Sequence, residues 1–280
     1  LNWFRRTYFP RRSGLVYGQL AQRGLARSTT EPPVITPANG RIPPGGAGLE
    51  INITTTAGSI YYTLDGSDPR LEGNRVAASA TRFTGPFNLP RSSELQARTL
   101  RRGIWSNLIE KSFGTDVSAL RISEIHYNPR PPDEDSPVSQ QDLEFIELVN
   151  TSGEALDLTG VHFSKGVEFD FTSSAVLDLA PGEFVVVVKD IEAFATRYNV
   201  GRILIAGEYR GNLANGGEEL ALQDALGENI IGFSYNDDWD PQTDGQGFPL
   251  ELVDLTVEAG LLDSSASWRA SSIMDGTPGF

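Results

Sequence analysis

The chain has 280 residues, with 29 glycines, 17 prolines, 39% hydrophobic residues and a formal net charge of −14 at pH 7. This length allows two domains, and this hydrophobic fraction can fill their cores, so a disordered chain is excluded. Because cysteine is absent and only two histidines occur, disulfides, thiolate catalysis and cysteine-ligated or three-histidine metal sites are excluded as well.

The charge is divided unevenly along the chain. Residues 1–115 hold 15 Lys and Arg against 7 Asp and Glu, a net of +8, whereas residues 116–280 hold 8 against 30, a net of −22. Such a division indicates modules with different surfaces. No apolar run approaches the roughly 20 residues of a membrane helix, so no membrane span is predicted.

The N-terminal residues 1–30 mix aromatic and basic side chains. Ser13 is placed to cap a short helix that ends at Gly24, and the prolines and glycines of residues 31–48 then interrupt any helix. Arginines beside aromatic rings can bind nucleic acid, but the acidic half of the chain would repel a polyanion. We therefore expect no nucleic acid partner and expect this segment to dock on protein.

Residues 49–113 have the period-two pattern of half-buried strands. Apolar residues alternate over 49–53 and again over 60–64, and Asp65-Gly66 then turns the chain. Two further short apolar runs follow at 83–89 and 95–100. Strands at this spacing predict a first β-sandwich.

The acidic part of the chain contains eight candidate strands and one helix. Asp190 is placed to cap a helix with an apolar face that includes Phe194 and Tyr198 and ends at Gly201. This composition favours a second sandwich or barrel over alternating βαβ units. The candidate strands are residues 120–127, 143–150, 167–171, 184–188, 202–206, 219–223, 230–235 and 249–255.

Several separate motifs occur in order over residues 118–280: LRISEIHYNP, DLEFIELVNTSGEALDLTGVHF, LAPGEFVVVV, GNLANGGEELALQDALGENIIGFSY, DGQGFPLEL, SWR and TPG. Together they resemble a lamin tail domain. The resemblance implies an immunoglobulin-like sandwich with no catalytic residue, in which Glu144, Phe145, Glu147 and Asn150 match recurrent strand positions. Bacterial members resemble secreted or surface-attached accessory modules, so the resemblance implies an extracellular or cell-surface location.

Two further resemblances lie upstream. SIYYTLDGSDPR, TGPFNL and WSN, within residues 34–115, resemble the small C-terminal β-sandwich of chitobiase and related β-hexosaminidases. WFRRTYFPRRSGLVYGQLAQRGL is similar to the end of a CotH kinase-like domain, and the same two modules follow that domain in large bacterial proteins. The resemblances divide the chain into residues 1–33, the end of a kinase-like domain, residues 34–115 and residues 118–280.

The fold class that follows is all-β, with two β-sandwich modules, the second an immunoglobulin-like lamin tail domain, and a short helical N-terminal segment. On this interpretation the chain is part of a longer protein, and its upstream domain is its first partner. The modules would position that catalytic part near an envelope, matrix or glycan.

The loop DPQTDGQGFPLE, residues 240–251, has the spacing of a calcium site. Asp240, Gln242, Asp244 and Glu251 fall at positions 1, 3, 5 and 12 of a calcium-binding loop, where oxygen ligands surround the cation. Gln242 replaces an acidic residue, however, and the flanking sequences are typical of strands rather than helices. The alternative is a glycine turn that leads into a strand, with Glu251 facing outward.

Three aromatic residues are candidates for a glycan site. Tyr235 and Trp239 precede the acidic loop, and Trp105 lies near the end of the first sandwich. An exposed ring can stack on a sugar while carboxylates accept hydrogen bonds from its hydroxyls. Burial in the core explains the same residues equally well. A polysaccharide-binding module, assisted by calcium, is therefore the alternative function.

The other polar residues do not predict a catalytic site or a cofactor beyond calcium. Glu144 and Glu147 are three residues apart on a candidate strand and point to opposite faces, which does not suit a glycosidase pair. His126 and His162 occur in no catalytic motif, so we expect them to pack or to lie on the surface. An enzyme in its own right is the least favoured interpretation.

Overall fold

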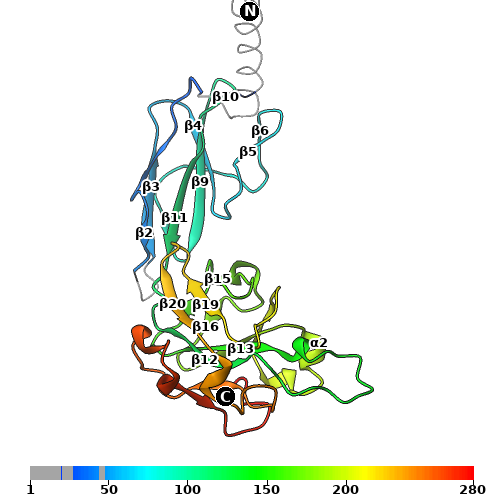
Figure 1. Cartoon of the computed structure of the whole chain (residues 1–280). Helices are drawn as coiled ribbons and strands as arrows, with labels where there is room; N and C mark the ends of the chain where they lie inside the picture. Colours follow the sequence, from blue (N-terminus) through cyan, green and yellow to red (C-terminus); the bar gives the residue numbers. More distant parts are fainter. Residues whose placement is uncertain (1–19, 21–27, 44–47) are drawn as a thin grey trace, which may run out of the picture. The chain divides into compact units, whose positions relative to one another are not determined.

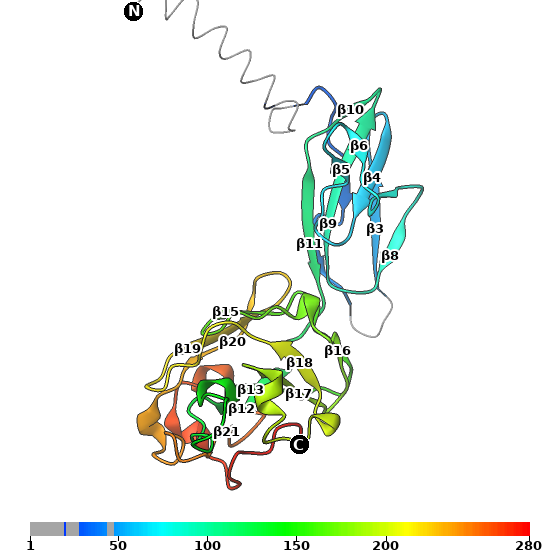
Figure 2. The ribbon, with the colours of Figure 1, turned by 90° about the vertical axis from the view of Figure 1, so that its right-hand side faces the viewer.

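The structure is a computed structural model that describes residues 20, 28–43 and 48–280. The helix predicted after Ser13 and, apart from Leu20, the segment compared with a kinase-like domain lie outside these residues. The chain forms two compact units that divide between Phe113 and Gly114. Both are built almost entirely of strands (Figures 1 and 2), so the prediction of an all-β fold is confirmed.

Two sheets and a short hairpin make up the described part of the first unit. Its strands are β1 (Val34–Thr36), β2 (Gly40–Arg41), β3 (Leu49–Thr54), β4 (Ser59–Thr63), β5 (Arg70–Leu71), β6 (Arg75–Val76), β7 (Thr81–Arg82), β8 (Phe87–Leu89), β9 (Ser93–Arg101), β10 (Ile104–Trp105) and β11 (Ile109–Gly114). One sheet has the order β1-β3-β8, and the other has the order β2-β11-β9-β4-β7 with β10 added to β9. Strands β5 and β6 form the hairpin.

Alternating side chains fill the core of the first unit. On β3, Ile51 and Ile53 are buried whereas Glu50 is exposed, because successive strand residues point to opposite faces. The period-two pattern of this region therefore does correspond to half-buried strands. The buried cluster joins both sheets and comprises Ile35, Ile42, Ile51, Ile53, Ile60, Leu89, Leu95, Ala97 and Phe113.

The second unit combines strands with several short helical turns. Its strands are β12 (Leu120–His126), β13 (Phe145–Asn150), β14 (Leu156–Asp157), β15 (His162–Lys165), β16 (Asp178–Leu179), β17 (Phe184–Val188), β18 (Ile205–Glu208), β19 (Glu219–Gln223), β20 (Asn229–Ser234), β21 (Leu250–Leu252) and β22 (Trp268–Ala270). Its helices are α2 (Ile191–Phe194) and the 3-10 turns η2 (Gln141–Leu143), η3 (Phe171–Ser173), η4 (Val200–Arg202), η5 (Asp237–Trp239), η6 (Ala259–Leu261) and η7 (Ser265–Ser267).

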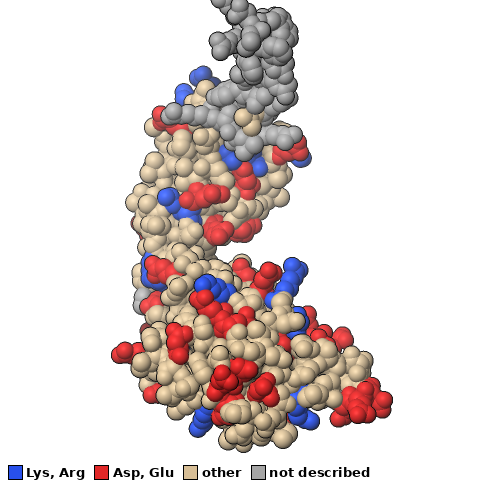
Figure 3. All heavy atoms as spheres, viewed as in Figure 1, with Lys and Arg blue, Asp and Glu red and all other residues tan. Residues whose placement is uncertain are grey.

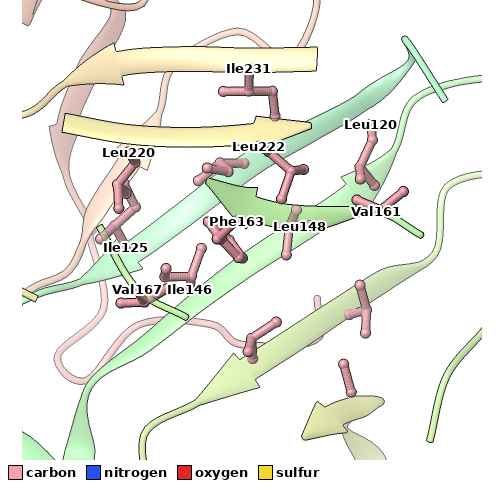
Figure 4. Packing of buried hydrophobic residues seen from close by; sticks show 14 of the residues in the cluster. Leu120, Ile125, Ile146, Leu148, Val161, Phe163, Val167, Leu220, Leu222 and Ile231 are labelled. Atoms are coloured by element: carbon pink, nitrogen blue, oxygen red, sulfur yellow. The ribbon is translucent and has the colours of Figure 1, made fainter. Parts of the chain in front are cut away.

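The main core of the second unit lies between a six-stranded and a three-stranded sheet. The larger sheet has the order β18-β17-β13-β12-β21-β22 and the smaller one β15-β19-β20. Figure 4 shows Ile146 and Leu148 of the larger sheet against Phe163 and Leu222 of the smaller one. Each fully buried aliphatic side chain of this kind contributes about 1.5–3 kcal/mol to stability. This is the sandwich expected for an immunoglobulin-like module.

The larger sheet is also covered on its outer face. All six residues of β13 are buried, so this strand does not show the alternation of a half-exposed strand. On the outer face, Phe145, Val186 and Val188 pack against Phe194 of α2 in a second, smaller cluster. Polar side chains that point outward from β12 and β13 are therefore enclosed by later parts of the chain.

The predicted helix after Asp190 is shorter than expected. Asp190 does cap it, since its side chain accepts a hydrogen bond from Ala193 N, but α2 ends at Phe194. Beyond this point the backbone tightens, with Thr196 N and Arg197 N donating to carbonyls three residues earlier, and the Thr196 hydroxyl also bonds to the Ala193 carbonyl. A hydroxyl that binds the preceding turn competes with helix continuation.

One predicted strand is wrong, and another begins later than predicted. Residues 167–171 form only isolated bridges and lead into η3, because the Asp170 side chain accepts from Thr172 N and caps that turn. Residues 202–206 begin in η4, where Asn199 accepts from Gly201 N, and the strand itself starts at Ile205. In both places a side chain of Asp or Asn offers the backbone a local partner, which replaces the strand at 167–171 and delays the start of the strand after Arg202.

Acidic side chains gather on the second unit in the view of Figure 3, in keeping with the charge of residues 116–280. Among the described residues, none of the helices has the length and apolar character that a membrane crossing needs.

Candidate functional site

Two of the aromatic residues proposed for glycan binding lie in the interior. Trp105 is 4% exposed, donates its indole N–H to the Asn74 carbonyl and meets Tyr61 edge-on at 5.6 Å between ring centroids. Tyr235 is 2% exposed, and its ring lies 4.8 Å from that of Tyr127. Both rings are packed against protein, which leaves no open face for a sugar.

Trp239 differs from these two because it is half-buried. It belongs to η5 and lies against the main core, with its ring centroid 6.5 Å from that of Trp268. Asp237 and Asp238 precede it in the same turn. Of the three aromatic candidates, Trp239 alone keeps a partly open surface beside carboxylates, and its role in glycan binding stays a prediction.

The four residues of the proposed calcium loop do not converge on one point. Asp240 accepts hydrogen bonds from Gln242 N and Ala270 N, and Asp244 accepts from the Asn128 side chain at 2.5 Å. Glu251 lies on β21 and pairs with Arg269. Within residues 28–43 and 48–280, no group of three or more His, Asp or Glu side chains is arranged to hold a metal ion. These contacts favour the turn over the calcium interpretation, which stays a prediction.

Glu144 and Glu147 are both buried but contact different parts of the protein. Glu144 accepts hydrogen bonds at 2.8 Å from the Tyr209 hydroxyl and from Leu213 N, which hold the loop after β18. Burial raises the pKa of Glu144 to about 7. Glu147 lies on β13, where its neighbours in sequence point into the main core and it points to the outer face. The two carboxyls therefore do not form a pair.

The carboxylate that does lie beside Glu147 comes from another strand. Glu124 on β12 is the direct cross-strand neighbour of Glu147 on β13, and on its other side Glu124 is the neighbour of Glu251 on β21. Directly opposite residues on adjacent strands have Cβ atoms about 5 Å apart. The outer face of the sheet therefore carries a row of three glutamates, which ends at Arg269, the partner of Glu251 on β22. We call Glu147, Glu124 and Glu251 the glutamate row.

The end of the chain closes over this row. Thr277 N donates to Glu124 at 3.3 Å, and Gly279 N donates to Glu147 at 2.5 Å. Glu147 also accepts from the Ser123 hydroxyl. Gly276 has a φ of +80° and lies so close that a Cβ there would overlap the carboxyl of Glu124. We call residues 275–280 the C-terminal segment.

Burial in this position shifts the titration of both glutamates. Glu124 is 1% exposed, and burial, helped by the neighbouring Glu147, raises its pKa to about 9. Burial also raises the pKa of Glu147 to about 7, against the opposing effect of its hydrogen bonds from Ser123 and Gly279. Near neutral pH the arrangement therefore holds a neutral carboxylic acid beside a carboxyl that is close to its midpoint.

A buried histidine lies on the same face. His126 is two residues after Glu124 on β12, is fully buried and meets Phe145 edge-on at 5.4 Å. Neither ring nitrogen has a hydrogen-bond partner among the described residues. Burial lowers the pKa of His126 to about 3, so the ring is neutral at pH 7. His162, by contrast, is partly exposed, and its Nδ1 lies 3.0 Å from the Gly160 carbonyl.

An acid beside a carboxylate can serve in general acid and base chemistry, but here the geometry favours another role. Glu124 and Glu147 accept their hydrogen bonds from two backbone N–H groups and the Ser123 hydroxyl, and the close contact at Gly276 occupies the space above Glu124. The site holds a segment of chain rather than an open position for a substrate.

Glu147 is among the residues singled out from the sequence, whereas Glu124 was missed. The signal available was an acidic residue inside each of two apolar runs, RISEIH and EFIELV. Their opposition depends on the register of β12 and β13, which includes a bulge between Ile122 and Glu124. The hydrogen bonds that cover these glutamates come from distant parts of the sequence. Thr277 lies 153 residues after Glu124, and Gly279 lies 132 residues after Glu147.

Comparisons with known families divide the chain at nearly the same point as the structure. Residues 114–237 match the Lamin Tail Domain family, and residues 49–113 match the family described as Fn3 associated. The lamin tail resemblance is thus confirmed, and the immunoglobulin-like fold expected for that module is confirmed with it. The upstream module is similar to the Fn3 associated family, and its resemblance to the C-terminal module of chitobiase stays a prediction.

No curated protein matches the chain. One solved structure, a DUF4876 family protein from Bacteroides thetaiotaomicron VPI-5482, is 11% identical to it, with a TM-score of 0.33 over 78% of this chain and 86% of that chain. A likeness this weak supports neither a shared fold nor a shared function.

Proposed function

We propose that the chain carries non-catalytic accessory modules from the C-terminal part of a larger secreted or surface bacterial protein. There they position a catalytic part near an envelope, matrix or glycan. The observation that supports this most directly is the succession of the two family matches over residues 49–237, since neither family is described as an enzyme. A fold alone does not define a function, so the proposal also rests on the contacts that the polar side chains of these modules make.

The polar groups of the second unit support the proposal. The carboxyls best suited to proton transfer, Glu124, Glu144 and Glu147, all accept hydrogen bonds from the chain itself. Such contacts stabilise the fold. The partner we propose is an upstream domain of the same protein, a CotH kinase-like domain, and the first module would be of the chitobiase C-terminal type.

The upstream gene sequence is the first test. We expect an export signal and a kinase-like domain before Leu1.

Deleting residues 34–280 from the full protein should move it from the envelope or matrix fraction to the medium, while its catalytic activity on a soluble substrate stays unchanged. An unchanged distribution would contradict the positioning role.

A second candidate function is polysaccharide binding, and the half-buried Trp239 beside Asp237 and Asp238 favours it. The folded chain would then be retained on an insoluble polysaccharide, and Trp239→Ala would lose that retention. Trp105→Phe is the matched control, because Trp105 is buried and we expect it to contact no sugar. Equal loss in both variants would contradict a site at Trp239.

Calcium is tested separately by thermal unfolding. A cation that binds the native state raises the unfolding temperature as its concentration rises. If the 240–251 loop binds calcium, millimolar calcium should raise the midpoint above its value in chelator, and Asp244→Asn should remove the increase. Equal midpoints in calcium and in chelator would end the calcium hypothesis.

A further inference from the structure

The glutamate row places two ionisable groups under the end of the chain. Glu124 and Glu147 are enclosed, whereas Phe280 is 71% exposed and the neighbouring Ile273 and Met274 are each 52% exposed. Within the C-terminal segment Pro278 is buried and Phe280 is exposed, so the segment covers the two carboxyls and reaches the surface at Phe280. Its hydrogen bonds to the glutamate row run through Thr277 N and Gly279 N.

The first residue of the segment is held by different contacts. Asp275 forms ion pairs with Arg130 at 3.0 Å and Arg197 at 3.2 Å, and its carbonyl accepts from the Tyr198 hydroxyl at 2.6 Å. Arginine stays charged throughout the pH range in which carboxyl groups titrate. Asp275 therefore stays anchored by its ion pairs while the carboxyls beneath the segment titrate.

From this arrangement we propose that residues 276–280 are a proton-dependent strap. The strap closes over the outer face of the six-stranded sheet while one of the carboxyls of Glu124 and Glu147 is protonated, and it opens when both are ionised. Two adjacent carboxylates repel each other and need water, and lifting the strap supplies that water.

The other charged and titratable groups around the pair come from several different elements and loops. Glu251 adds negative charge from β21 but is paired with Arg269. Tyr198 stays protonated because burial raises its pKa further above the usual range, and His126 stays neutral. The charged groups at the start of the segment are Asp275, Arg130 and Arg197. Tyr198 and His126 keep the same charge between pH 5 and pH 9, so we assign the pH dependence to Glu124 and Glu147.

The direction of the effect follows from the pKa shifts. Because the folded, closed state holds a proton on Glu124 that a solvated glutamate would release, closing is favoured at low pH. The equilibrium constant for opening rises with pH between the pKa of Glu124 in the open state and its higher pKa in the closed state. Release of a single proton changes this constant by at most about tenfold for each pH unit. Opening would expose the sheet face that carries the glutamate row.

Hydrogen exchange of the whole chain between pH 5 and pH 9 tests the proposal. After correction for the intrinsic rate, protection of the peptide covering residues 271–280 should fall by about tenfold or more over this range, while β13 stays protected. In the double variant Glu124→Gln/Glu147→Gln, in which neither carboxyl can ionise, the protection should change by less than about twofold. Glu124→Gln alone should have a smaller pH dependence than the wild type, because only Glu147 can then ionise.

The matched control is Glu251→Gln, which changes the third member of the row but leaves the buried pair. It should keep the pH dependence of the wild type. The proposal is overturned if protection of 271–280 is independent of pH in the wild type, or if Glu124→Gln has the same slope. It is also overturned if β13 loses protection together with the segment, because the unit then unfolds as a whole.

Discussion

His126 shows how a single side chain sets the acid limit of stability. Its neutral ring is buried against Phe145, and one buried N–H remains without a partner among the described residues. An unpaired buried donor costs about 1–3 kcal/mol. Burial also lowers the pKa of His126 to about 3. As pH falls below about 6.5, the unfolded chain binds a proton at His126 that the folded chain does not. The free energy of unfolding therefore falls between about pH 6.5 and pH 3.

We therefore expect His126→Phe to raise the free energy of unfolding by about 1 kcal/mol at pH 7. The advantage over the wild type should grow as pH falls from about 6.5 to about 4, because the variant has no ring to protonate on unfolding. Urea unfolding at several pH values measures both effects. A constant difference across this range would show that His126 does not titrate as its burial requires.

In the first unit, the ion pair between the partly exposed Asp68 and the buried Arg98 provides the corresponding test. Both of its oxygens accept from Arg98 at 2.7 Å, and the Arg98 side chain is only 5% exposed. Asp68→Ala removes the carboxylate from that buried guanidinium and should lower the free energy of unfolding by about 3 kcal/mol. Asp65→Ala is the control, since Asp65 accepts from Ser67 in an exposed turn. A smaller loss for Asp68→Ala than for Asp65→Ala would contradict a stabilising role for this ion pair.

At the scale of elements, local patterns predicted the strands well. The expected strand at 184–188 is β17 and the one at 219–223 is β19, because apolar alternation and nearby turns are local properties. The predictions were wrong at 167–171, where Asp170 caps a turn, and beyond Phe194, where the helix tightens. The glutamate row was not predictable in this way, because it depends on strand register and on the distant C-terminal segment.

The turn before β19 gives a sharp element-scale prediction. Gly217 has a φ of +103°, and a Cβ there would overlap the Tyr235 carbonyl oxygen, whereas a Cβ at Gly216 would meet nothing within 4 Å. Gly217→Ala should therefore lower the free energy of unfolding by about 2 kcal/mol or more, and Gly216→Ala by less than about 0.5 kcal/mol. Urea unfolding of both variants decides this, and equal losses would mean that Gly217 is not confined by the Tyr235 carbonyl.

At the scale of the whole molecule, the two units have separate buried clusters. Differential scanning calorimetry should accordingly resolve two transitions, and two-state analysis should fail for the intact chain. Asp68→Ala should lower only one unfolding temperature and Gly217→Ala only the other. A single transition that both variants shift by the same amount would contradict independent cores.

Asp240, in the loop that first suggested calcium, also occupies the edge of the six-stranded sheet. Strand β22 is the last strand of the six-stranded sheet, and Asp240 accepts a hydrogen bond from its Ala270 N–H at 3.3 Å. An open strand edge is a template on which another chain can add a strand, and a charged side chain on that edge prevents the addition. We therefore expect the carboxylate of Asp240 to disfavour edge-to-edge addition of a second chain at β22.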